Sequence, residues 1–151
     1  MHKEFFQTLQ KDHEEVKGIL KHLKETSARA SKSREDLFSK LKKEIVPHMK
    51  SEEKVFYPAL KEKKEAREDT LESIQEHHVA ELVLNELDAN PKNGEEWGAK
   101  LSVFKEIVEH HIEEEEEKIF QDARKELKED EMERILKGFN EEKEKIKSSM
   151  A

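Results

Sequence analysis

The segment HMKSEEKVFYPAL at residues 48–60 decides the fold, because an altered copy of it, HIEEEEEKIFQDA, stands at residues 111–123. His48 and Glu52 align with His111 and Glu115 at an offset of 63 (111 − 48). A spacing of four residues places both side chains of each pair on one face of a helix, about one turn apart. Two separate helices are therefore expected to present the same pair of side chains.

A second pair of segments repeats at nearly the same offset. DHEEVKGILKHL at residues 12–23 aligns with EHHVAELVLNEL at residues 76–87, which pairs His13 with His77 at an offset of 64 (77 − 13). Two helix pairs repeated in this way indicate an internal duplication with approximate two-fold symmetry. We expect a site with two centres on that symmetry axis.

Apolar residues recur at helical spacing in four stretches, from Phe6 to Leu23 and over about 34–60, 68–88 and 95–125. The expected inward residues are Phe6, Leu9, Val16, Leu20, Leu23, Leu37, Leu41, Ile45, Val55, Ala59, Leu71, Ile74, Leu84, Leu87, Trp97, Leu101, Phe104, Val108 and Ile119. Pro47 should kink the second helix or break one of its backbone bonds. Short connections between long helices predict an all-α fold, an antiparallel up-and-down four-helix bundle over residues 1–127.

Residues 128–151 form the second predicted part of the chain. Met132, Ile135, Leu136 and Phe139 recur at helical spacing there. We expect a short amphipathic helix that packs on or beside the bundle, across its end.

Composition limits the function. The net charge is −8, the charged residues make up 44% of the chain with Lys and Arg interleaved among Glu, and there is no Cys. No basic face is expected for nucleic acid, and no thiolate site or disulfide is possible. The start, MHKEFFQTLQKDHEE, lacks the apolar core of a signal peptide, and no apolar run is long enough for a membrane span. A cytoplasmic protein without a nucleic-acid or membrane partner is expected.

Polar residues interrupt the apolar stripes at matching positions, and they are candidate metal ligands. They are His13, His48, Glu52, His77, His111 and Glu115. Burying these groups without partners would cost several kcal/mol each, whereas a bound cation satisfies them. A lone core His, or one HxxxE in so Glu-rich a chain, indicates little. The duplicated set indicates a metal site, and imidazole with carboxylate suits iron, manganese or zinc.

Two choices of register remain open at these positions. His110 with Glu114 has the same spacing as His111 with Glu115, and His78 could replace His77. The apolar stripes and the alignment of the repeats favour His77, His111 and Glu115. Tyr57 lies about two turns beyond His48 and is interpreted as a core aromatic residue, with a place beside the centre as the alternative.

The combined pattern resembles the hemerythrin-like, or HHE cation-binding, family over roughly Phe5 to Ala123. The matching motifs are Asp12-His13, His48 to Glu52 followed by Tyr57-Pro58, Glu76-His77, and His111 to Glu115 followed by Ile119-Phe120. The resemblance implies an oxo- or hydroxo-bridged pair of iron ions, with Glu52 and Glu115 bridging and the four His as terminal ligands. Zinc or manganese could substitute for iron.

The sequence departs from the family pattern at two positions. Oxygen-carrying hemerythrins have a second His one turn after the third-helix His, where this chain has Glu81, and the equivalent position on the first helix is Lys17. We expect Glu81 on the core stripe as a seventh ligand, or else as a hydrogen-bond partner of a ligand, which would make the two irons inequivalent. Gln121 stands where the family often has Pro, which should affect only the helix end.

Three functions fit this pattern. The resemblance implies a binding protein that takes up dioxygen or nitric oxide, or stores iron. A small di-iron enzyme that reduces peroxide or nitric oxide, or supports iron-centre repair, is the alternative. A metal-free charged bundle that acts as a structural partner is the third.

Overall fold

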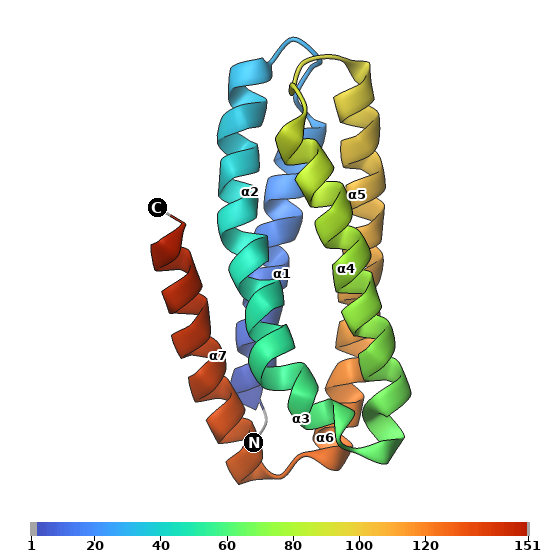
Figure 1. The fold of residues 1–151 in the computed structure, drawn as a ribbon, viewed down its shortest axis with the longest axis vertical. Coiled ribbons are helices and arrows are strands. Elements are labelled where there is room, and N and C mark those ends of the chain that lie inside the picture. The colour runs from blue at the N-terminus through green and yellow to red at the C-terminus, as the bar shows by residue number, and fades with distance from the viewer. Residues whose placement is uncertain (1–2, 151) are drawn as a thin grey trace.

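The computed structural model describes residues 3–150, and helices with short connections make up this part of the chain. The long helices α1 (Lys3–Lys24), α2 (Ser31–Ser51), α4 (Arg67–Ala89) and α5 (Glu95–Glu114) lie side by side (Figure 1). The predicted all-α class is confirmed, since no strand occurs between residues 3 and 150. None of the helices in this range is long and apolar enough to cross a bilayer.

Shorter segments extend or connect the long helices. A π-helical turn η1 (Glu52–Phe56) and helix α3 (Tyr57–Lys61) continue α2, and the 3-10 turn η2 (Lys64–Ala66) leads into α4. A second π-helical turn, η3 (Glu115–Ile119), and helix α6 (Phe120–Glu126) continue α5. Helix α7 (Glu129–Ser149) ends the described chain.

A buried arginine ties together the two connections at one end of the molecule. Arg34 donates hydrogen bonds to the carbonyls of Lys92 (2.8 Å) and Gly94 (3.1 Å), and its guanidinium lies 5.2 Å from the Trp97 ring centre. The Gly94 N–H donates to the Ala28 carbonyl at 3.0 Å, with a φ of 95° that favours glycine. These bonds join the 25–30 and 90–94 connections, which meet at the same end in Figure 1.

The apolar core has two parts. The first, the Leu41 cluster, consists of Val16, Ile19, Leu20, Leu23, Phe38, Leu41, Ile45, Met49, Ala80, Leu84, Leu87, Trp97, Leu101, Phe104, Val108 and Ile112. The second, the Phe56 cluster, consists of Phe5, Phe6, Leu9, Phe56, Tyr57, Leu60, Ala66, Ile119, Phe120, Ala123, Leu127, Met132, Ile135 and Phe139. The predicted His ligands lie near the boundary between the two clusters, and Met49 and Ile112 of the Leu41 cluster directly follow two of them.

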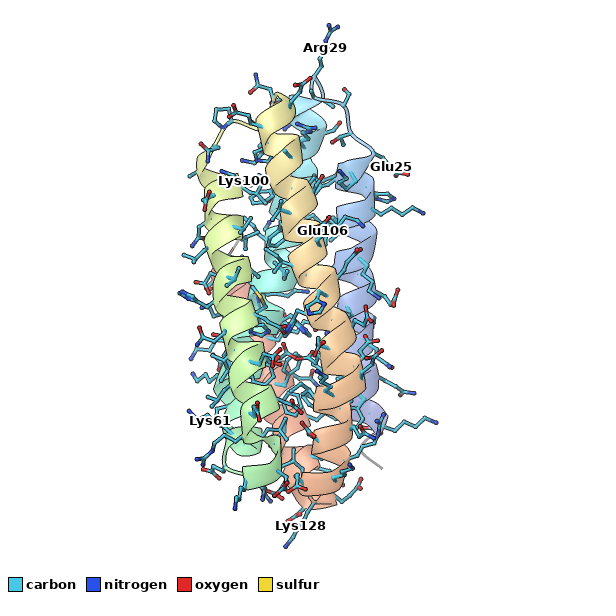
Figure 2. The ribbon with its side chains drawn as sticks, turned by 90° about the vertical axis from the view of Figure 1, so that its right-hand side faces the viewer. Glu25, Arg29, Lys61, Lys100, Glu106 and Lys128 are labelled. Carbon is cyan, nitrogen blue, oxygen red and sulfur yellow. The ribbon has the colours of Figure 1, made fainter. Side chains whose placement is uncertain are left out.

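Charged side chains cover the outside of the molecule. Figure 2 shows Arg29 at one end, Lys128 at the other, and Lys100 and Glu106 projecting from the faces between them. This arrangement explains how a chain with 44% charged and 33% hydrophobic residues still folds, because the apolar residues are concentrated on the inner helix faces.

The inner face of α4 differs from the prediction. Leu71, expected inside, is 45% exposed, so that prediction is wrong, and Ile74 is only partly buried. The buried residues are Thr70, Ser73, His77, Ala80, Leu84 and Leu87, at alternating spacings of three and four. Small residues therefore form half of this seam and let α4 approach its neighbours closely, whereas the prediction followed the large apolar residues.

The C-terminal helix is longer than expected, and it lies beside the bundle and not across its end. Helix α7 has 21 residues and runs back beside α2 instead of crossing the end of the bundle (Figure 1). Met132, Ile135 and Phe139 are buried, and the Phe139 ring meets the Phe5 ring edge-on at 5.6 Å. The expected packing across the end is therefore corrected to packing along the side of the helices.

Candidate metal centre

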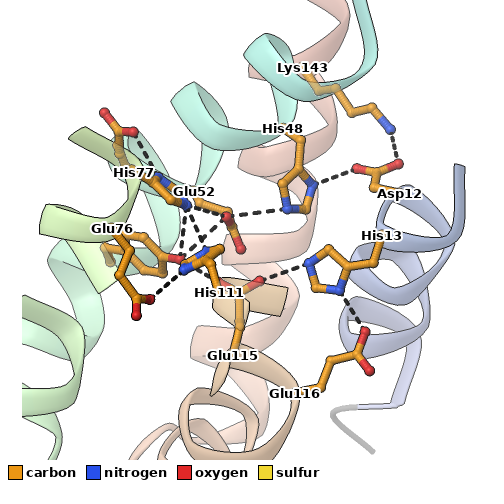
Figure 3. Close-up of polar contacts among 12 residues, drawn as sticks. Asp12, His13, His48, Glu52, Glu76, His77, His111, Glu115, Glu116 and Lys143 are labelled. Carbon is orange, nitrogen blue, oxygen red and sulfur yellow. Dashed lines mark hydrogen bonds and ion pairs between the residues drawn. The ribbon is translucent and has the colours of Figure 1, made fainter. Parts of the chain in front are cut away.

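Six of the predicted ligands meet between the Leu41 and Phe56 clusters. They are His13 on α1, His48 on α2, Glu52 in η1, His77 on α4, His111 on α5 and Glu115 in η3 (Figure 3). All six are buried, and both carboxylates are 0% exposed. The helices thus direct four imidazoles and two carboxylates into one polar layer.

The six side chains form two groups that share both carboxylates. One group contains His13 and His48 and the other His77 and His111, and within each group the ligand atoms lie within 4.8 Å of one another. The Nε2 atoms of His48 and His77 each lie 3.2 Å from Glu52 Oε1. The other carboxylate, Glu115, lies 3.0 Å from His13 Nε2 through Oε1 and 3.7 Å from His111 Nε2 through Oε2. Each carboxylate therefore faces both groups.

The two carboxylates stand at the start of π-helical turns. The Tyr57 N–H donates to the Glu52 carbonyl, and the Phe120 N–H donates to the Glu115 carbonyl, five residues back in each case. In an α-helix, a residue five positions later lies about 140° around the axis, whereas one π-helical turn returns it to nearly the same face. Tyr57 consequently faces the same centre as Glu52.

The extra residue of η1 also changes which apolar residues are buried. The α-helical spacing predicted Val55 and Ala59 inside, but both are only partly buried. Phe56 and Leu60, one position later in each case, are fully buried in their place. The predicted stripe therefore fails by one residue at the point where the helix changes from α to π.

A carboxylate accepts a hydrogen bond from the outer nitrogen of every one of the four imidazoles. Because an ionised carboxylate only accepts, each His Nδ1–H is the donor. The bonds join His13 to Glu116 (2.6 Å), His48 to Asp12 (2.9 Å), His77 to Glu53 (2.8 Å) and His111 to Glu76 (2.7 Å). These bonds fix the ring orientations and leave each Nε2 toward the centre, as in metal sites whose His ligands are held by carboxylates.

The acids that hold the imidazoles follow the internal repeat. Asp12 and Glu76 each precede a predicted ligand, while Glu53 and Glu116 each follow one. A neighbour in sequence lies about 100° around the helix, so each acid faces the adjacent helix and reaches the His there. Sequence reasoning missed all four as site residues, although their adjacency to the ligands and their offsets of 64 and 63 were a usable signal.

The electrostatics of the centre favour charged groups despite the burial. Burial lowers the pKa of His48, but the Glu52 carboxylate and the hydrogen bond to Asp12 outweigh it and raise that pKa to about 10. Burial also lowers the pKa of His77, but the hydrogen bonds to Glu52 and Glu53 outweigh this effect and raise the pKa to about 9. Burial raises the pKa of Glu52, yet His48 and His77 hold it well below its usual range. In the metal-free protein, His48, His77 and Glu52 therefore stabilise one another as imidazolium and carboxylate ions.

Some buried nitrogen and oxygen atoms of the centre form no hydrogen bond within the described residues. His48 Nε2 and Glu52 Oε2 make no hydrogen bond, and His77 Nε2 lies only 3.0 Å from His111 Nε2. Two imidazole nitrogens in such contact need a proton or a cation between or beside them. The donor set of imidazole nitrogen and carboxylate oxygen fits a pair of divalent transition-metal ions, with no thiolate required.

Tyr57 lies at the centre, which is the alternative place considered for it. Its hydroxyl donates to Glu115 Oε2 and lies 3.3 Å from Glu52 Oε1 and 3.4 Å from His77 Nε2. Burial and the two carboxylates raise the pKa of Tyr57 well above its usual range, so the hydroxyl keeps its proton. The repeat has Phe120 at the matching position, and the hydroxyl therefore makes the two halves of the centre chemically different.

The structure does not bring Glu81 to the other predicted ligands. Its carboxylate forms an ion pair with Lys50 at 2.8 Å and is 39% exposed, while Ala80, one position earlier, occupies the inner face. The alternative ligands also point outward, because His110 is 64% exposed and His78 is exposed as well. The register that selects His77 and His111 is the one that the structure places inside.

A small apolar cavity adjoins the imidazoles on the side of the Leu41 cluster. Its volume is about 20 Å³, room for about one water molecule or a diatomic ligand. The four imidazoles and Glu76 line it together with Val16, Ile45, Met49, Ala80, Val108 and Ile112, while Glu52, Glu115 and Tyr57 do not. The polar layer thus has carboxylates and a hydroxyl on one side and an apolar space on the other.

Comparison with protein families agrees with this arrangement. The family model of the hemerythrin HHE cation binding domain matches residues 4–123. The chain belongs to this family. No curated protein and no solved structure matches it. The resemblance stated from the motifs is confirmed, and the chain contains a cation-binding hemerythrin domain whose buried His and Glu groups suit a metal. Helix α7 lies beyond the matched residues of this hemerythrin domain.

Proposed function

We propose that the chain binds two iron ions at the two groups that share Glu52 and Glu115. The bound ions would take up dioxygen, nitric oxide or peroxide, or the protein would store iron at this site. The main support for two ions is that both groups contain Glu52 and Glu115, since each carboxylate faces imidazoles of both groups. The fold that we infer for this site is the antiparallel up-and-down four-helix bundle, supported by the side-by-side long helices and their end connections in Figure 1.

Each residue of the centre has a defined task in this proposal. The Nε2 atoms of His13, His48, His77 and His111 would hold the ions at the two ends, and the oxygens of Glu52 and Glu115 would bridge them. The four acids on the Nδ1 side keep the imidazoles oriented and raise their basicity. When bound, the iron pair supplies open coordination positions and electrons for a small ligand.

The apolar cavity supports the choice of ligand. It adjoins all four imidazoles and has room for about one diatomic molecule, but not for an organic substrate. Its walls are mainly aliphatic, and its polar lining residues are Glu76 and the four imidazoles. Such a space favours a small ligand of low polarity. Dioxygen and nitric oxide are small and nearly apolar, so they are the ligands that we infer for this space.

Metal analysis of anaerobically purified protein tests the proposal, with an absorption spectrum before and after air. We expect two irons per chain and a near-ultraviolet band that appears in air and disappears on removal of dioxygen. A chain that binds no iron, and whose behaviour is indifferent to chelators, would instead be a metal-free structural bundle. Two zinc or manganese ions per chain would support the two-ion site and contradict the choice of iron.

The di-iron enzyme is retained as the second candidate because of Tyr57. Its protonated hydroxyl, hydrogen-bonded to Glu115, could donate a proton during reduction of peroxide or nitric oxide. Tyr57→Phe copies the residue that the repeat carries at Phe120, so the shape is compatible with the fold. Peroxide turnover by the wild type in the presence of an added reductant that returns two electrons per peroxide, at least tenfold slower in Tyr57→Phe at equal iron content, would favour the enzyme. Reversible ligand binding without turnover would favour the carrier.

A further inference from the structure

A lysine of helix α7 reaches the centre from outside the hemerythrin match. The Nζ of Lys143 lies 2.5 Å from Asp12 Oδ1, and Asp12 Oδ2 accepts the hydrogen bond of His48 Nδ1 at 2.9 Å (Figure 3). Phe139, four residues earlier on the same face of α7, packs edge-on against the His48 ring at 5.8 Å. Burial of Phe139 therefore fixes where Lys143 enters the site.

No other acid of the centre has so close and so buried a cation. Asp12 and Lys143 are 5% and 18% exposed, whereas the 3.8 Å pair between Lys50 and Glu53 has a lysine that is 42% exposed. Glu76, which matches Asp12 in the repeat, forms no ion pair with a lysine or arginine among residues 3–150. Besides the His111 that it holds, only His110 lies near it, at 3.9 Å. The internal symmetry of the centre is thus broken at one acid.

Electrostatics determines whether Lys143 raises or lowers the affinity of His13 and His48 for a metal ion. A carboxylate behind an imidazole draws on its Nδ1–H and strengthens the hold of Nε2 on a cation. A positive charge on that carboxylate weakens this pull, and it also repels a cation held at the far side of the ring. Both effects of Lys143 therefore reduce the affinity of the His13 and His48 group for a metal ion.

We propose that Lys143 makes the ion held by His13 and His48 the weaker and more easily exchanged of the two, so that the C-terminal helix is a working part of the metal centre. Lys143 is a positioning residue in this scheme, because it acts through Asp12 and touches no ligand atom. The inference rests on the proposed two-ion site, and it goes beyond it by assigning unequal roles to the two ions.

Zinc is the probe for the test, because it is diamagnetic and does not change oxidation state. Metal-free protein is titrated with Zn²⁺ and the loaded protein is then titrated with a chelator, while nitrogen-15 NMR follows the ring signals of the four histidines. In the wild type, His77 and His111 should respond to the first equivalent and His13 and His48 to the second. Chelator should remove the two ions in the reverse order.

Three variants separate charge from structure. Lys143→Met should tighten zinc binding at His13 and His48 by about tenfold, the scale of one unit charge acting across the ring and a partly screened carboxylate. Lys143→Arg should behave as the wild type. Lys147→Met is the matched control, because Lys147 lies one turn later on α7 and pairs with Glu44 at 3.2 Å, away from the centre.

The outcomes distinguish the inference from the function on which it rests. A wild type that binds no zinc or iron overturns the two-ion site and the inference together. The inference alone is overturned if the wild type binds two ions and Lys143→Met leaves the zinc affinity unchanged or lowers it. It is also overturned if Lys147→Met changes the affinity as much as Lys143→Met does. A wild type in which His13 and His48 fill first also overturns it.

Discussion

Metal binding to this centre should release protons, because the same atoms hold protons in the metal-free protein. His48 and His77 have pKa values of about 10 and about 9, so both are protonated at pH 7. A cation needs the lone pair of each Nε2, and the Nδ1–H stays with Asp12 or Glu53. At least two protons should therefore leave when two ions bind.

The magnitude follows from the distance between these pKa values and the working pH. At 1.36 kcal/mol per pH unit, removing the proton at pH 7 takes about 4 kcal/mol for His48 and about 3 kcal/mol for His77. The overall constant for binding two ions should rise about 100-fold per pH unit between pH 7 and 8.5, since two protons compete. The stability of the metal-free protein depends on pH in the opposite direction. Its contribution from these histidines is complete below pH 6.5 and disappears as pH rises through 9 to 10.

Isothermal titration calorimetry with Zn²⁺ measures the effect directly, in buffers that differ in ionisation enthalpy. We expect at least two protons released per chain at pH 7, about one fewer in His48→Gln, and an unchanged number in His110→Ala, since that imidazole is 64% exposed. Release of less than one proton, or an affinity independent of pH, would refute the reasoning about the metal-free centre.

Three further predictions concern the surroundings of the centre. Phe139→Ala should lower the free energy of unfolding by about 3–5 kcal/mol in urea titrations, since the ring is fully buried, and a loss under 1 kcal/mol would mean that α7 is not docked. Ala80→Leu should fill the cavity and weaken azide or nitric oxide binding at least tenfold at unchanged metal content, and unaltered binding would place the ligand elsewhere. Burial and the neighbouring Asp69 carboxyl raise the pKa of Asp122 to about 7, so wild-type stability should fall as pH rises from about 4 to 7. Asp122→Asn should therefore raise the melting temperature at pH 8 more than at pH 5, and equal shifts would exclude this carboxyl pair as the cause.

Duplicated motifs were enough to predict the all-helical class and the residues that meet at the centre. The repeat carries this information because matching positions in two halves must face one site. The place of Glu81 could not be derived in the same way, since the matching position in the first half is Lys17, which is not a candidate metal ligand. Its prediction relied on a stripe of large apolar residues, and the small residues Ser73 and Ala80 define the true inner face of α4.

The π-helical turns were outside what apolar periodicity can predict. A spacing rule assumes one helical pitch, and a single extra residue moves every later side chain by about 100°. Val55 was therefore predicted inside in place of Phe56, and a place at the centre was only the alternative for Tyr57. Lys143 was equally out of reach, because its contact with Asp12 depends on where α7 docks, and nothing in its own sequence neighbourhood sets that position.

The matching π-helical turns bear on how the molecule originated. Glu52 and Glu115 begin turns of the same length at corresponding points, and an origin by duplication would mean that the inserted residue was present in the single hairpin before it was copied. Such a hairpin carries one carboxylate and two imidazoles, half of the centre. Two identical hairpins paired about a two-fold axis would have completed it, and fusion into one chain then freed Tyr57 and Phe120 to diverge.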